Sequence, residues 1–184
     1  MTPPTYAELR AAMPRSDGEA CIFAHDLRKW IDGEGAIRLN INPDYQRGHV
    51  WTEAQAAAFV GHRLEGGDSP TLTIQRWADN PVDEIVDGKQ RITAVLDFVE
   101  GRIPALLSDG GLYYLRDWTP EDQGRILHGF QLMLRARTVM LPTRADVLRL
   151  YLRLNRGGSI HTDAEIERVR VLLAAELAGM TSCA

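Results

Sequence analysis

Lysine and cysteine are both scarce in this chain of 184 residues. The two cysteines, Cys21 and Cys183, lie far apart, so they predict neither a disulfide framework nor a paired-cysteine metal site. Lys29 and Lys89 are the only lysines, and the other 19 cations are arginines. No apolar run approaches the ~20 residues that cross a bilayer, and no signal peptide is visible. We therefore expect a cytoplasmic protein with no membrane partner.

The chain also lacks a strong charge bias, internal repeats and low-complexity segments. Its net charge is −4, and it has 45% hydrophobic and 25% charged residues, which are ordinary globular values. This charge argues against a surface coated with basic groups, but it allows a local basic cleft. The length favours one domain with a real core. We predict an N-terminal extension over residues 1–20 and a single domain over residues 21–184.

The most informative stretch is residues 85–96, where the sequence pattern changes. An apolar run ends at Asp87-Gly88, and apolar residues then recur at spacings of three and four, as on one helix face. This pattern predicts a strand, a tight turn and a helix, whose first backbone N–H groups form a seat for a phosphate. Lys89, Gln90 and Arg91 add donors, and Asp87 adds a carboxylate. The structural alternative is that Asp87 caps the helix, Gly88 relieves the turn and the cations are solvated.

A second polar motif, Tyr45-Gln46-Arg47, lies ahead of Trp51 in the sequence. The planar guanidinium of Arg47 suits phosphate oxygens, and Gln46 can both donate and accept hydrogen bonds. The alternative is that Tyr45 and Trp51 anchor the core while Arg47 makes a structural ion pair. We favour a place in the site for Arg47 and a structural role for Trp51.

A third motif contains Arg153, Asn155, Gly157 and Gly158, at the end of a predicted helix. Paired glycines let the backbone approach a ligand, with Arg153 and Asn155 pointing into the site. The alternative is a helix C-cap and turn, because glycine and asparagine tolerate the left-handed conformation. His161 lies beside the glycines and titrates near neutral pH, so it is a candidate acid or base.

In this order, the three motifs resemble the ParB/sulfiredoxin-like superfamily, in particular its branch that includes the N-terminal domain of GmrSD modification-dependent restriction enzymes. That branch reads Tyr-Gln-Arg and Trp, then Asp-Gly-Gln-Gln-Arg-Leu-Thr, then Arg-Leu-Asn-x-Gly-Gly. This chain departs from it at Lys89, where Gln is usual, and at Ile92, where Leu is usual. The resemblance spans about residues 22 to 170 of the printed sequence.

The resemblance implies a small α+β domain, a mixed twisted sheet of four or five strands wrapped by five or six helices, with the motifs converging on one cleft. The sequence patterns place the strands near residues 37–41, 72–77, 82–86, 112–115 and 132–139. They place the helices near residues 25–31, 52–64, 91–100, 119–129, 144–155 and 163–177. The superfamily includes CTP-hydrolysing clamps, nucleases and kinases, which share phosphate handling at the strand–turn–helix, and fold alone does not choose among them.

From the motifs and the resemblance we expect an enzyme that binds and hydrolyses a nucleoside triphosphate with Mg²⁺, in DNA defence, counter-defence or DNA modification. The predicted catalytic residues are Asp87, Gln90, Arg91 and His161, with Asp87 also holding the metal. The predicted binding residues are Tyr45, Gln46, Arg47, Gly88, Lys89, Arg153, Asn155, Gly157 and Gly158. Expected partners are a nucleotide, DNA and a separate nuclease or modification protein. The alternatives are a non-catalytic module that senses nucleotides or modified DNA, and a transferase acting on hypermodified bases of phage DNA.

Overall fold

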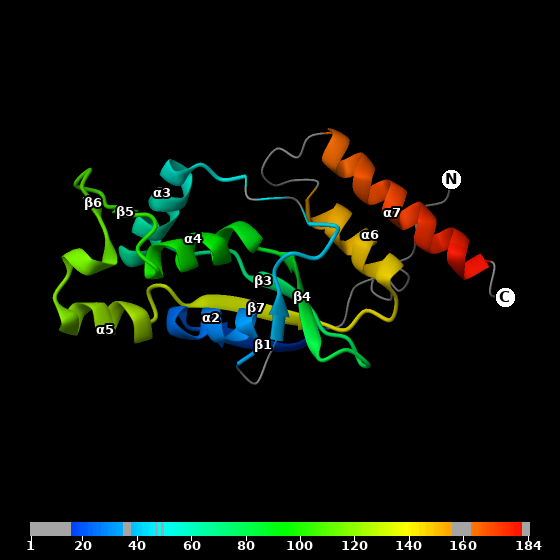
Figure 1. Cartoon of the computed structure of the whole chain (residues 1–184), viewed down its shortest axis with the longest axis horizontal. Helices are drawn as coiled ribbons and strands as arrows, with labels where there is room; N and C mark the ends of the chain where they lie inside the picture. The colour runs from blue at the N-terminus through cyan, green and yellow to red at the C-terminus, as the bar shows by residue number, and fades with distance from the viewer. Residues whose placement is uncertain (1–15, 35–37, 47, 49, 156–162, 182–184) are drawn as a thin grey trace.

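A five-stranded mixed sheet forms the centre of the computed structural model (Figure 1). Its strand order is β1-β7-β3-β4-β2, in which β1 runs antiparallel to β7, β7 parallel to β3, β3 antiparallel to β4 and β4 parallel to β2. The strands are β1 (Ser16–Ile22), β2 (Arg38–Asn40), β3 (Leu72–Gln75), β4 (Val82–Asp87) and β7 (Leu134–Val139). The structure describes residues 16–34, 38–46, 48, 50–155 and 163–181.

The described ranges contain six α-helices around this sheet, which confirms the predicted α+β class. They are α2 (Ala24–Asp32), α3 (Glu53–Leu64), α4 (Lys89–Val99), α5 (Pro120–His128), α6 (Arg144–Leu154) and α7 (Asp163–Thr181). A small hairpin of β5 (Ala105–Leu106) and β6 (Leu112–Tyr113) precedes the 3-10 turn η1 (Leu115–Asp117). In Figure 1, α6 and α7 lie side by side at one end of the sheet, and α3 and the hairpin lie at the other end. None of the described helices is both long enough and apolar enough to span a bilayer.

Threonine caps mark the starts of α3 and α5. Thr52 accepts a hydrogen bond from the Gln55 backbone N–H, and the Gln55 side chain accepts one from the Thr52 N–H, which completes a capping box for α3. Thr119 caps α5 ahead of a proline in its first turn. These local signals explain why the predicted helices lie close to the observed ones.

The buried residues form two clusters, and the space between them is where the site lies. One cluster packs α2, α3 and α4 against the sheet, with Phe98 and Ile92 among its fully buried members. The second packs α6 and α7 against β4, with Tyr45, Val86 and Tyr151 among its members. Helix α4 therefore starts at the boundary between two separately packed parts of the core.

The fold differs from the prediction in which strands form the main sheet. The strand expected near residues 112–115 is the short β6 of the separate hairpin, and the N-terminal end supplies a strand of the main sheet instead. Strand β1 pairs with β7 along Ser16–Ile22, so the boundary expected at residue 20 falls inside a strand. β1 is an edge strand on which Glu19 and Cys21 are exposed and Ile22 is buried. An edge strand covered on one face needs few apolar residues, which is why its sequence gives a weak signal.

Candidate functional site

Gly88 forms the turn that carries strand β4 directly into helix α4. Its φ is +107°, and a Cβ added at this position would come within 2.1 Å of Leu72 Cδ2, so both the backbone and the neighbouring strand require glycine. Gly88 is itself the N-cap of α4, with no side-chain cap and no acidic residue in the first turn. The alternative in which Asp87 caps the helix is therefore wrong. The positive end of α4 has no local carboxylate cap.

Asp87 instead accepts a hydrogen bond from Arg91, one helical turn later. The Asp87 Oδ2 to Arg91 Nη2 distance is 2.7 Å, and Arg91 Nη1 donates to the Pro70 carbonyl oxygen. The Arg91 side chain is 10% exposed and that of Asp87 is 37% exposed. Because Arg91 binds a carboxylate on one side and a backbone carbonyl on the other, it fixes the direction of the Asp87 side chain. Asp87 Oδ1 accepts no hydrogen bond from the described residues.

Lys89 is buried, although the structural alternative placed it in solvent. Only 9% of its surface is exposed, and loss of solvation lowers the pKa of its ammonium group from the ordinary value. An anion close to a buried lysine stabilises the charged form of its ammonium group. The cation that stands where the related branch uses glutamine is therefore part of the pocket wall.

Two glutamines fix the loop that joins β2 to α3 against β4 and α4. Gln46 Nε2 donates to the carbonyl oxygens of Val86 at 2.9 Å and Ile85 at 3.2 Å. Gln90 Oε1 accepts from the backbone N–H groups of Val50 at 3.1 Å and Trp51 at 3.3 Å, and its Nε2 donates to the Gly48 carbonyl oxygen at 3.2 Å. The Gln90 amide therefore holds the loop, and its predicted catalytic role stays a prediction.

Tyr45 lies in the core, so its prediction as a ligand-binding residue is corrected. It is fully buried and its ring packs edge-on against Tyr151, with the ring centroids 5.4 Å apart. Its hydroxyl donates to Glu84 and to the Ile85 carbonyl oxygen. Burial raises the pKa of this hydroxyl and also the pKa of the Glu84 carboxyl. The hydroxyl consequently stays protonated as a donor, and Tyr45 anchors the loop as the structural alternative proposed.

Helix α7 braces the same loop from the other side. Arg168 Nη2 donates to the Gln46 carbonyl oxygen at 2.9 Å and to the Tyr45 carbonyl oxygen at 3.4 Å. Arg144 on α6 pairs with Asp44 in the loop and, through Nε, with Glu176 on α7 at 3.0 Å. The loop position thus depends on both C-terminal helices.

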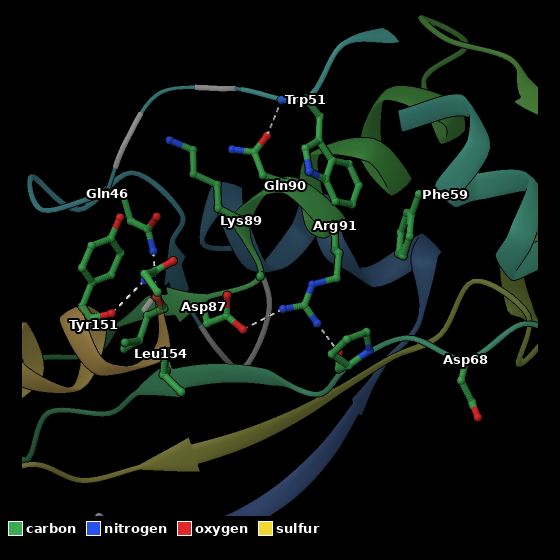
Figure 2. Close-up of a pocket in the computed structure, with 14 residues that line it drawn as sticks. Gln46, Trp51, Phe59, Asp68, Asp87, Lys89, Gln90, Arg91, Tyr151 and Leu154 are labelled. Carbon is green, nitrogen blue, oxygen red and sulfur yellow. Dashed lines mark hydrogen bonds and ion pairs between the residues drawn. The ribbon is translucent and has the colours of Figure 1, made fainter. Parts of the chain in front are cut away.

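These elements enclose a pocket of about 400 Å³. In Figure 2, Trp51 and Phe59 lie on one side and Gln46, Tyr151 and Leu154 on the other, with Asp87, Lys89 and Arg91 between them. The predicted residues that line it are Gln46, Asp87, Gly88, Lys89, Gln90, Arg91 and Asn155. Arg153 is exposed on α6 and is not among the lining residues. Arg47, Gly157, Gly158 and His161 lie outside the described residues, so their roles stay predictions.

The family model described as "GmrSD restriction endonuclease, N-terminal domain" matches residues 27–130, more than half of the chain. The chain belongs to this family. No curated protein and no solved structure matches it significantly. The matched range of the GmrSD N-terminal domain family includes the strand–Gly88–helix turn and the loop ahead of α3.

Part of the pocket wall in this GmrSD-family chain comes from residues that the sequence did not predict. Trp51 was expected to be purely structural, yet its half-buried ring lines the pocket beside Phe59. Pro70, Tyr151 and Leu154 also line it, although they belong to segments far apart in the sequence. The spacing of Trp51 and Phe59 carried no signal for a ligand, because aromatic residues near a helix start are usual in a core.

The carboxylates that line the pocket limit the metal ions that it could hold. The described residues include no group of three histidine, cysteine or carboxylate side chains that could hold a metal ion. Two carboxylates line the pocket, and the side chain of Asp68 is 95% exposed whereas that of Asp87 is held by Arg91. Mg²⁺ commonly binds through one or two carboxylates together with substrate phosphates and water. Asp87 therefore fits a Mg²⁺ ion that binds together with a polyphosphate.

Proposed function

We propose that this chain is a nucleoside-triphosphate-binding and hydrolysing domain that acts in DNA defence. The observation that carries the proposal is the buried Lys89 beside the uncapped start of α4, in a pocket large enough for a small molecule. A buried cation next to the positive N-terminal end of a helix favours an anion of concentrated charge. The chain belongs to a family of restriction endonuclease N-terminal domains, and this membership supports the link to DNA defence.

In this proposal, Lys89 and the first N–H groups of α4 bind the phosphates. Their charge is in place before the ligand arrives, and the low solvent content around Lys89 strengthens the interaction. Arg91 acts differently from the sequence expectation, because its guanidinium is engaged by Asp87 and Pro70. Its role is to orient Asp87, so it is a positioning residue whose charge also contributes to the field of the pocket.

Asp87 is the residue that we assign to turnover. Oδ2 is held by Arg91, so Oδ1 has a fixed direction from which to hold a metal ion or to orient a water molecule. A bound Mg²⁺ would neutralise charge that develops on the transferred phosphate. The carboxylate thus serves hydrolysis more than affinity, whereas Lys89 serves affinity.

A phosphate-release assay with each of the four nucleoside triphosphates and Mg²⁺ tests this proposal. We expect turnover for at least one nucleotide, and we expect Asp87→Asn to reduce turnover while it leaves affinity nearly unchanged. Asp32→Asn is the matched control, because Asp32 is an exposed carboxylate on α2 with a long 3.7 Å pair to Arg28.

Binding without turnover in the wild-type protein would favour the non-catalytic sensing module instead. Absence of both binding by calorimetry and phosphate release would refute the proposed function. A change in the mass of DNA nucleosides after treatment with the protein would favour the transferase. We also expect a separate nuclease or modification protein as a partner. Pull-down in the presence and absence of nucleotide tests whether such a protein binds this chain.

A further inference from the structure

The pocket has an apolar end that inorganic phosphate cannot use. Trp51 and Phe59 line one side of it, and the charged turn formed by Asp87, Gly88 and Lys89 lines the middle. Its volume of about 400 Å³ is in the range of pockets that take small organic molecules. A ligand that matches this wall carries both an anionic group and a flat apolar group.

The two aromatic rings form a preformed surface. Their centroids are 5.3 Å apart, at an interplanar angle of 59°, which is a favourable tilted contact. Both residues are half-buried, pack against the main core and line the pocket, so packing restricts their rotamers. A rigid aromatic surface of this kind suits the face of a nucleobase, because every base has a π-face.

Gln90 connects the aromatic end of the pocket to the phosphate end. Its Oε1 accepts from the Trp51 backbone N–H at 3.3 Å, and it follows Lys89 directly in the first turn of α4. The distance between the aromatic wall and the start of α4 is consequently set by a side chain of α4 itself. One ligand that spans both ends would have both parts positioned by the same helix.

We infer that the ligand is a free nucleotide whose base lies against Trp51 and Phe59 while its phosphates lie at Gly88 and Lys89. The inference rests on the proposed function and adds to it the part of the pocket that binds the base. It assigns Trp51 to ligand binding, where its position near a helix start indicated only packing. It also distinguishes a nucleotide site from a site for inorganic polyphosphate.

The test compares nucleoside triphosphates with inorganic tripolyphosphate, by calorimetry at fixed Mg²⁺. We expect the wild-type protein to bind at least one nucleotide about tenfold or more tightly than tripolyphosphate, the factor typical of one stacked base. Trp51→Leu should remove most of this difference and leave tripolyphosphate affinity unchanged, whereas Trp51→Phe should retain much of it. Lys89→Met should weaken both ligands.

Controls separate loss of contact from loss of folding. Trp118→Leu removes another half-buried tryptophan, which packs on Phe98 away from the pocket, and should change neither affinity. If Trp51→Leu does not fold, Phe59→Leu gives the same comparison from the second ring. Melting temperatures for all variants show whether each one is folded at the assay temperature.

The outcomes distinguish this inference from the proposed function. Equal affinity of the wild-type protein for nucleotides and tripolyphosphate, with no effect of Trp51→Leu, would overturn the base-binding inference and leave the phosphate seat intact. If the wild-type protein binds neither the nucleotides nor tripolyphosphate, both proposals are overturned. Displacement of the nucleotide by a short single-stranded DNA at matched phosphate concentration would assign the pocket to nucleic acid and overturn the free-nucleotide assignment.

Discussion

Replacing Lys89 by methionine should make the protein more stable and weaker in binding at the same time. Methionine retains the length and the apolar stem of lysine but removes the positive charge of a residue that is only 9% exposed. In the ligand-free protein this charge is poorly solvated, which is why its pKa is lowered. With a polyphosphate in the pocket, as we propose, the same charge would contribute a strong contact. Stability and affinity therefore change in opposite directions.

The stability part of this prediction depends on pH in a defined way. The unfolded chain has a lysine with the ordinary pKa of 10.5, and the folded chain has a lower one, so the unfolded state binds more protons between the two values. Wild-type stability should therefore rise with pH through this interval. The advantage of Lys89→Met is complete below the folded-state pKa and disappears as pH rises to about 10.5, the upper end of the interval.

The sizes of the two effects can be set by general magnitudes. We expect Lys89→Met to raise stability by on the order of 1 kcal/mol near pH 7, which for a chain of this size raises the melting temperature by about 2–4 °C. Loss of a contact to a charged group weakens binding by about 1.5–3 kcal/mol, or roughly ten- to a hundred-fold. Both can be measured on one preparation, by thermal unfolding and by calorimetry with a nucleoside triphosphate.

The scarcity of lysine provides both the control and a direct measurement. Lys29 is exposed on α2 and pairs with Asp26 at 3.5 Å, so Lys29→Met should change neither affinity nor the pH profile. Because the chain has two lysines, carbon-13 labelling of their side chains gives few signals, and the pKa of Lys89 can be titrated directly by NMR. A Lys89 pKa at or above 10.5, or a lower melting temperature for Lys89→Met with unchanged affinity, would refute the reasoning.

Three further predictions concern the residues that hold the pocket. Gly88→Ala should lower the free energy of unfolding in urea by about 2–4 kcal/mol, because it adds a clash with Leu72 to an unfavourable φ. Gly66→Ala is the control, with φ +89° and open space around it, and should cost about 1 kcal/mol. Equal costs would show that the contact with Leu72 is unimportant. Arg91→Ala should destabilise by about 1.5–3 kcal/mol, and unchanged unfolding would show that its bonds carry no stability. Arg168→Ala should weaken nucleotide binding about fivefold with little change in melting temperature, because Arg168 holds the backbone at Gln46. Arg170→Ala on the same helix should leave binding unchanged. Equal effects of the two changes would show that Arg168 does not position the loop.

The turn at Gly88 was predictable from sequence because every signal for it is local. The change from an apolar run to helical spacing lies within a dozen residues, and Asp-Gly marks the turn between them. The capping box at Thr52 is local in the same way. The sequence did not show which donor would bind the Asp87 carboxylate. A helix cap and an ion pair to Arg91 are both compatible with the same residue types.

Burial was less predictable than element type, because it depends on segments distant in the sequence. Tyr45 is fully buried through contact with Tyr151, which comes from the other end of the chain. Lys89 is buried by the packing around the pocket, and no sequence pattern marks a lysine as desolvated. The pocket-lining role of Trp51 depends in turn on the loop that Gln90 holds. Tyr45 and Trp51 are also among the positions at which the predicted roles changed.

The range of the family match and the extent of the pocket differ, and the difference has a functional consequence. The match ends at residue 130, but Tyr151 and Leu154 on α6 and Asn155 at its C-cap line the same pocket. Arg168, further along on α7, holds the backbone of the loop that carries Gln46. A fragment limited to the matched range would thus retain the Gly88 turn and Lys89 but lose one wall of the pocket and the brace of its loop. The unit that forms the pocket and holds its loop therefore includes α6 and α7, and assays of the proposed activity require a chain that contains both.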